Sequence, residues 1–120
     1  MNDFEVEIRK ALTEYRDLTA DELKKAVKKA SKTVKSEIQA HAPRKTGTYA
    51  KSWIVTTEHE DSGSIALVVH SKEHYRRTHL LENGHALRNG GRARAFPHIA
   101  PAREKGETQL ESDLKNALKG

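Results

Sequence analysis

The sequence predicts an α+β fold with two N-terminal helices, a small antiparallel β-sheet and a C-terminal helix packed on that sheet. Three observations lead to this prediction. Apolar residues recur at helical spacing through 4–17 and 19–42. Two runs rich in β-branched residues follow at 52–57 and 64–70. A last apolar stripe begins after Pro101. With 120 residues, the chain is expected to form one domain over 1–120.

The first helix is predicted from a single apolar stripe that ends near Asp17. Its members lie four, four and three residues apart, which places them on one face of a helix. They are Phe4, Ile8, Leu12 and Tyr15.

The second helix has a recognisable start and stop. Thr19 and Glu22 form the pattern of a capping box, in which each side chain bonds the backbone amide of the other. Pro43 ends the helix, because a proline disfavours helical geometry in the residue before it. The apolar face between these limits consists of Leu23, Val27, Ala30, Val34 and Ile38.

The middle of the chain predicts a hairpin and then a short helix. Residues 60–63 (EDSG) carry turn chemistry between the two β-rich runs. Residues 75–82 fit a short helix that Asn83 and Gly84 would close, since glycine is the common residue after a helix C-terminus.

Residues 84–96 show no periodicity and contain three arginines and a Gly90-Gly91 pair. Long irregular connections are uncommon in compact domains and are often functional. We therefore interpret this segment as a flexible arm, with a merely mobile loop as the alternative. Arginine offers bidentate contacts to carboxylates or phosphates. The candidate interface residues of this arm are Arg88, Arg92, Arg94 and Phe96. Beyond it, Pro97 and Pro101 are expected to fix entry to the last helix, which runs to about Leu118.

Composition excludes several classes of protein. Cysteine is absent, which rules out disulfides and thiol catalysis. We find neither a signal peptide nor an apolar run long enough for a membrane helix, so a soluble, intracellular protein is expected, with no membrane partner. The net charge of +5 permits binding to nucleic acid or to an acidic protein surface, although ordinary solubility explains it as well. Six lysines lie on the polar side of the second helix: Lys24, Lys25, Lys28, Lys29, Lys32 and Lys35. Such a run is usually a solvated face.

The candidate residues for a metal or hydrolytic site are His79, Glu82 and His85. Their spacing matches neither of the helical zinc patterns HExxH and HxxEH, and Gly84 would take His85 off the shared face. The serines lie in strand or turn contexts without a nucleophile elbow. We therefore predict no cofactor, no metal and no enzymatic activity.

Three motifs, in order, resemble one known family. Residues 41–54 (HAPRKTGTYAKSWI) resemble its APxxTGxLxxSI signature, residues 75–85 its YxxxLExGh element, and residues 96–102 (FPHIAPA) its PFhxPA element. Together they are similar to the gene-product-ten-like tail-component family of lambdoid phages, over about 4–118. Tyr49 and His98 depart from the usual apolar residues. We interpret seven positions of these motifs as structural: Pro43, Thr46, Gly47, Glu82, Gly84, Pro97 and Pro101.

The resemblance implies a structural virion protein of a tailed bacteriophage, assembled in the host cytoplasm and placed at the head–tail interface. It implies a neck, connector or tail-completion subunit that forms a closed ring, expected to be a hexamer. Its partners would be copies of itself and the adjacent neck, connector and tail-tube proteins, with contact to packaged DNA a further expectation. The alternatives are a small basic nucleic-acid-binding module, which would lack an aromatic stacking platform, and a small His/Glu metal hydrolase.

Overall fold

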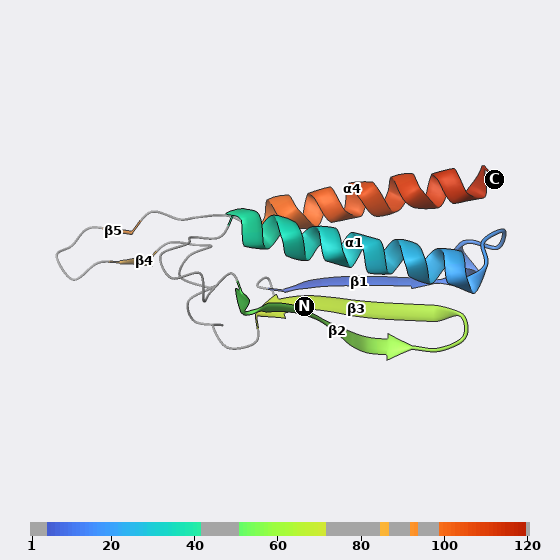
Figure 1. The fold of residues 1–120 in the computed structure, drawn as a ribbon, viewed down its shortest axis with the longest axis horizontal. Coiled ribbons are helices and arrows are strands. Elements are labelled where there is room, and N and C mark those ends of the chain that lie inside the picture. The colour runs from blue at the N-terminus through green and yellow to red at the C-terminus, as the bar shows by residue number, and fades with distance from the viewer. Residues whose placement is uncertain (1–4, 42–50, 72–84, 87–91, 94–98, 120) are drawn as a thin grey trace.

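In the computed structural model, which describes residues 5–41, 51–71, 85–86, 92–93 and 99–119, two long helices lie over a three-stranded sheet (Figure 1). The helices are α1 (Ala20–His41) and α4 (Ile99–Leu118). The sheet is antiparallel, in the order β1-β3-β2. Its strands are β1 (Val6–Ala11), β2 (Trp53–Glu60) and β3 (Ser64–Ser71). A 3₁₀ turn, η1 (Leu12–Glu14), follows β1, and two short strands, β4 (His85–Ala86) and β5 (Arg92–Ala93), form a second pair. The predicted α+β class is therefore correct.

The prediction of a first helix over residues 4–17 was wrong, because this segment forms β1 and η1. β1 pairs with β3 along its whole length, from Val6 opposite Val69 to Ala11 opposite Ser64. Val6 and Ile8 are buried, whereas Glu7 is half-buried and Arg9 is exposed, which is the alternation of a strand with one face covered. The described part of the chain thus contains two α-helices and not three.

The second predicted helix is confirmed as α1, and so is its capping box. The Thr19 hydroxyl accepts from the Glu22 amide at 3.1 Å, while the Glu22 carboxylate accepts from the Thr19 amide at 3.0 Å. Asp21 and Glu22 also place negative charge at the positive end of the helix dipole. The apolar face predicted from the sequence is the buried one, since Leu23, Val27, Ala30, Val34 and Ile38 are fully enclosed.

The predicted hairpin is confirmed as β2 and β3. The two strands pair from Trp53 opposite Ser71 to Glu60 opposite Ile65, with a bulge between Thr57 and His59. One face of the sheet carries Ile65, Leu67 and Val69, which pack beneath α1. Trp53, at the start of β2, is the largest fully buried side chain in the described part of the chain.

The C-terminal helix packs mainly on α1, which corrects the prediction that it lies on the sheet. Figure 1 shows α4 along one flank of α1 and the sheet along the other, and the buried stripe of α1 faces both. Small residues at Ala102 and Gly106 allow this close approach, and Gly106 faces Val34 and the Ala30 carbonyl of α1. One edge of α4 also lies near β1, and Arg103 donates to the carbonyl of Glu5, just before that strand, at 3.4 Å.

Several sequence predictions lie outside the described residues. The short helix over 75–82 is one, and the motif positions Pro43, Thr46, Gly47, Glu82, Gly84 and Pro97 are others. Pro101 is described and lies in the first turn of α4. Neither of the two helices described is long and apolar enough to cross a lipid bilayer.

Candidate assembly surfaces

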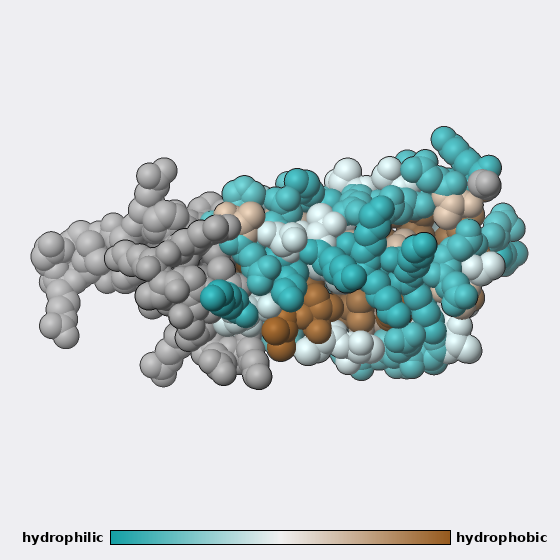
Figure 2. All heavy atoms as spheres, viewed as in Figure 1, coloured by the Kyte–Doolittle hydropathy of each residue, from teal (hydrophilic) through white to brown (hydrophobic). Residues whose placement is uncertain are grey.

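The lysines of α1 form one surface on the side of the helix away from its buried stripe, with Lys24 and Lys29 at its flanks. They lie opposite the buried stripe of α1, so that both the sheet and α4 are on the other sides of this helix. Figure 2 shows hydrophilic side chains over most of the described body in this view. We call this surface the lysine face; it consists of Lys24, Lys25, Lys28, Lys29, Lys32 and Lys35.

Two members of the lysine face are paired within the chain. Lys24 donates to the Asp61 carbonyl and lies 3.1 Å from the Glu60 carboxylate, which ties α1 to the β2–β3 turn. Lys29 lies 3.8 Å from Asp113 of α4. Within the described part of the chain, the other four lysines have no acidic partner. Five of the six lysines of the lysine face, all except Lys35, line a shallow hollow of about 590 Å³ together with Asp21 and Glu60. The lysine face therefore carries uncompensated positive charge beside a concave surface.

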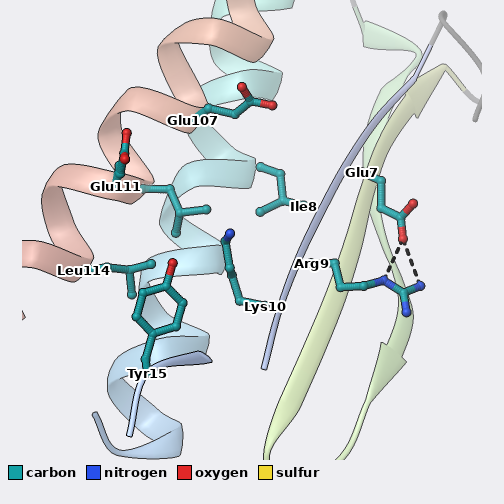
Figure 3. Close-up of a pocket in the computed structure, with 9 residues that line it drawn as sticks. Glu7, Ile8, Arg9, Lys10, Tyr15, Glu107, Glu111 and Leu114 are labelled. Carbon is teal, nitrogen blue, oxygen red and sulfur yellow. Dashed lines mark hydrogen bonds and ion pairs between the residues drawn. The ribbon is translucent and has the colours of Figure 1, made fainter. Parts of the chain in front are cut away.

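A second concave surface lies between the edge strand β1 and α4. Its apolar floor is formed by Ile8, Leu110 and Leu114, each almost fully buried, and the hollow measures about 300 Å³. Figure 3 shows α1 behind this hollow, with α4 on one side and the sheet on the other. We call this surface the β1–α4 groove.

The rim of the β1–α4 groove is mainly acidic. Glu107 and Glu111 project from α4, and neither has a basic partner in the described part of the chain. Lys10 is the opposing cation, but its ammonium lies 4.0 Å from Glu14 and 5.9 Å from the centre of the Tyr15 ring. Figure 3 shows the remaining charges, those of Glu7 and Arg9, on the far side of β1. There Arg9 donates to the Glu7 carboxylate at 2.9 Å, so the pair is self-neutralising.

The β2–β3 turn brings together a serine, a histidine and an aspartate. His59 Nε2 lies 3.0 Å from Asp61 Oδ2 and 3.1 Å from Ser64 Oγ, and Ser64 Oγ donates to Asp61 Oδ1 at 2.8 Å. A catalytic triad needs the imidazole to use one nitrogen for each partner. Here one nitrogen serves both, and the Ser64 proton is already held by Asp61. The arrangement is exposed and stabilises the turn.

Asp61 is the strongest acid in this turn. Its carboxylate accepts from the Ser64 hydroxyl, from the Gly63 amide at 3.0 Å and from His59. These hydrogen bonds favour the charged form and lower the pKa of Asp61 from its ordinary value of 3.8 to about 2. Sequence reasoning recognised the turn but did not foresee this network.

The predicted arginine arm is only partly described. Arg92 belongs to β5, where it pairs with Ala86 of β4, and His85 pairs with Ala93. Figure 1 places this small ladder beyond the end of α1, away from the three-stranded sheet. Arg88, Arg94 and Phe96, and the metal candidates His79 and Glu82, lie outside the described residues. In the part of the chain that is described, no cluster of three or more histidines and carboxylates could hold a metal ion.

These features define a small α+β domain with a charged outer helix and an open groove on its other side. The chain matches the family model described as "Bacteriophage HK97-gp10, putative tail-component" over residues 7–84, well over half of its length. It belongs to this family of bacteriophage tail components. Comparisons with curated proteins and with solved structures gave no match.

Membership confirms the family resemblance found in the sequence and defines the protein as a phage tail component. The family is structural, which implies a non-enzymatic role. The matched region includes β1, α1 and the β2–β3 hairpin, and ends before α4. The lysine face therefore lies within the family region, whereas the α4 wall of the β1–α4 groove lies beyond it.

Proposed function

We propose that this chain is a neck or tail-completion subunit, which forms a closed ring between the capsid and the tail. The observation that carries the proposal is its membership in the tail-component family over residues 7–84. A ring also requires each subunit to present two different surfaces, because cyclic assemblies close through head-to-tail contacts. The lysine face and the β1–α4 groove are two such surfaces on one small domain.

The expected symmetry is six-fold, and the neighbours along the particle axis would be connector and tail-tube proteins. In this assembly the arginine arm, with Arg88, Arg92, Arg94 and Phe96, would contact acidic groups on adjoining subunits. Arginine suits this role because its planar guanidinium holds a carboxylate with two parallel hydrogen bonds.

Deletion of the gene for this chain, followed by electron microscopy of the lysate, tests the proposal. We expect filled heads and separate tails that fail to join, with joining restored when the protein is added back. Image averaging of purified necks, with a tag fused to the chain, should then place it in a closed ring at the head–tail interface. A tag found along the tail tube or at the tail tip would contradict the proposed position. A two-fold dimer in the particle would contradict the ring.

A further inference from the structure

The lysine face and the β1–α4 groove lie on different sides of the body. The buried stripe of α1 faces the sheet and α4, so the lysines point outward from the opposite side of the helix. The walls of the groove are β1 and α4, and α1 lies behind it in Figure 3. One copy can therefore use both surfaces at once, toward two different neighbours.

The charges on the two surfaces are opposite and equally spaced. Lys25, Lys28 and Lys32 follow one another at intervals of three and four residues, and so do Glu104, Glu107 and Glu111. Glu107 and Glu111 line the groove, and Glu104 continues the same acidic stripe of α4 one turn beyond it. Each set extends over eight residues of helix, and the first and last charge are about 10 Å apart along the axis at the usual rise per residue. All six side chains are exposed, and none has an oppositely charged partner within the described part of the chain. Two helices with such stripes match in both charge and length.

We propose that the lysine face of one copy of this chain docks on the β1–α4 groove of the next copy. This inference rests on the proposed ring, for which it supplies the contact between neighbours. Because the two surfaces differ and face in different directions, the contact repeats from copy to copy instead of pairing two copies face to face. A repeated contact of this kind closes into a ring when its rotation permits.

The chemistry of both surfaces suits this contact. A lysine carries a long aliphatic stem, which can lie along an apolar surface while its ammonium reaches a charged group. The floor of Ile8, Leu110 and Leu114 offers that surface, and Glu107 and Glu111 stand at its rim. Lys10 limits the negative charge of the groove, but Glu14 and the Tyr15 ring already attract its ammonium. The groove therefore favours an incoming cationic helix.

Charge reversal tests the contact in the full-length protein. The lysine-face variant is K25E/K28E/K32E, and the variant of the acidic stripe on α4, which includes Glu107 and Glu111 of the groove, is E104K/E107K/E111K. Each variant alone should weaken self-association by about tenfold or more, because three attractive pairs become repulsive. The two variants mixed together should associate again, and so should one chain that carries all six changes, since each then meets an opposite charge. Sedimentation over a range of concentrations measures this, and added salt should weaken the wild-type contact.

The matched control is R16E/K51E/K119E, which changes the net charge of the chain as much as the lysine-face variant does. These three residues are exposed and lie outside both surfaces. The control should associate like the wild type. Failure of the mixed variants to recover would overturn the inference, as would an equal loss in the control.

Cross-linking in assembled particles decides the question if the free chain associates weakly. The chain has no cysteine, so K28C/E107C provides the two thiols for a short bis-maleimide. We expect a ladder of covalent oligomers that stops at the ring size, whereas K28C or E107C alone should give no species larger than a dimer. K51C/E107C should give no such ladder. Particles that contain the chain but show no ladder would overturn this contact and leave the proposed function intact. Particles without the chain would instead overturn the proposed function.

Duplex DNA is the other ligand that a lysine-covered helix would attract. A fluorescent 20-base-pair duplex, titrated with wild type and with K25E/K28E/K32E, distinguishes the two occupants. Binding lost in the variant while its self-association persists would show that the lysine face serves nucleic acid, and our inference would be wrong. Loss of self-association with little DNA binding in either protein would support the contact between copies.

Discussion

Gly106 of α4 lies directly against Val34 of α1, so that a Cβ atom at position 106 would overlap Val34 Cγ2 and stand 3.4 Å from the Ala30 carbonyl oxygen. Beside it, the Thr33 hydroxyl donates to the Gln109 side-chain oxygen. One turn away, Lys105 donates to Glu37 at 2.7 Å. The missing side chain at 106 therefore sets how near α4 can lie to α1.

Gly106→Ala should destabilise the protein by about 1–2 kcal/mol, through overpacking. Alanine gains up to about 1 kcal/mol of helix propensity over glycine, which opposes the effect. The clash should prevail because Val34 is fully buried and β-branched, and so cannot easily rotate away. Urea denaturation followed by circular dichroism measures the change in the free energy of unfolding.

A double-mutant cycle isolates the contact between these two residues. In a Val34→Ala background, Gly106→Ala should become neutral or stabilising, with a coupling of about 1 kcal/mol or more. If Gly106→Ala costs the same with and without Val34, the close packing of α4 on α1 at this point is not what limits position 106.

The capping box of α1 gives a second prediction. Thr19→Ala should lower the free energy of unfolding by about 1 kcal/mol, because the Glu22 amide would lose its hydrogen-bond acceptor. Thr108→Ala is the matched control. Thr108 is exposed within α4, so its replacement should stay within about 0.5 kcal/mol. Equal effects of the two substitutions would show that the cap contributes nothing measurable.

The turn network around Asp61 predicts a dependence on pH. A lowered carboxyl pKa means that the folded state favours the charged form, so this stabilisation is present above pH 4 and is lost as the pH falls toward about 2. Asp61→Asn removes the charge at every pH. The variant should therefore melt below the wild type at pH 7, and the difference between their melting temperatures should shrink as the pH approaches 2.

Thermal melts of both proteins at several pH values measure this difference. Comparing two proteins at each pH matters because other carboxylates, such as Glu37, also have a pKa below the usual value. For Glu37 the cause is the Lys105 ammonium that donates to it. A difference between wild type and Asp61→Asn that stays constant from pH 7 to pH 2 would contradict the role given to Asp61.

The elements predicted correctly from the sequence are those whose determining residues lie close together along the chain. α1 has a capping box at one end and an uninterrupted apolar stripe, and both depend on residues only three or four apart. The β2–β3 hairpin has turn residues between two β-branched runs, so its pairing partner is its neighbour in sequence. Such elements are determined by interactions within a short window.

The N-terminal strand was mispredicted because its partner is distant. Ile8 and Leu12 fit a helical stripe, but Val6 and Ile8 fit the alternation of a strand equally well. The edge of β3 decides between them, because its backbone donors and acceptors need partners and β1 supplies them. Those residues lie nearly sixty positions further along the chain.

The two candidate surfaces differ in the same way. The lysine face belongs to a single helix, so sequence reasoning recovered every residue in it. The β1–α4 groove combines Ile8 and Tyr15 with Leu110 and Leu114, which only the fold brings together. Its prediction would have required knowing that the chain begins with a strand and that α4 reaches that strand's edge.

The last prediction concerns the arginines of the arm, Arg88, Arg92 and Arg94. Replacing all three by alanine should change the free energy of unfolding of the isolated chain by no more than about 0.5 kcal/mol, as for ordinary surface substitutions. Residues 84–96 contain little apolar material to bury, which motivates this expectation. In the particle, the same arginines would meet carboxylates where neighbours exclude water, which strengthens charge-assisted hydrogen bonds.

The triple variant should therefore fold normally and yet join far fewer heads to tails. Thermal melts of the isolated chain and particle counts by electron microscopy measure the two halves. Arg16→Ala, at an exposed position outside the arm, serves as the control and should leave both unchanged. If the triple variant melts early, the arginines stabilise the subunit itself. If it joins heads to tails as the wild type does, they take no part in assembly. Either result would refute the interface role, because that role requires the loss to appear only where subunits meet.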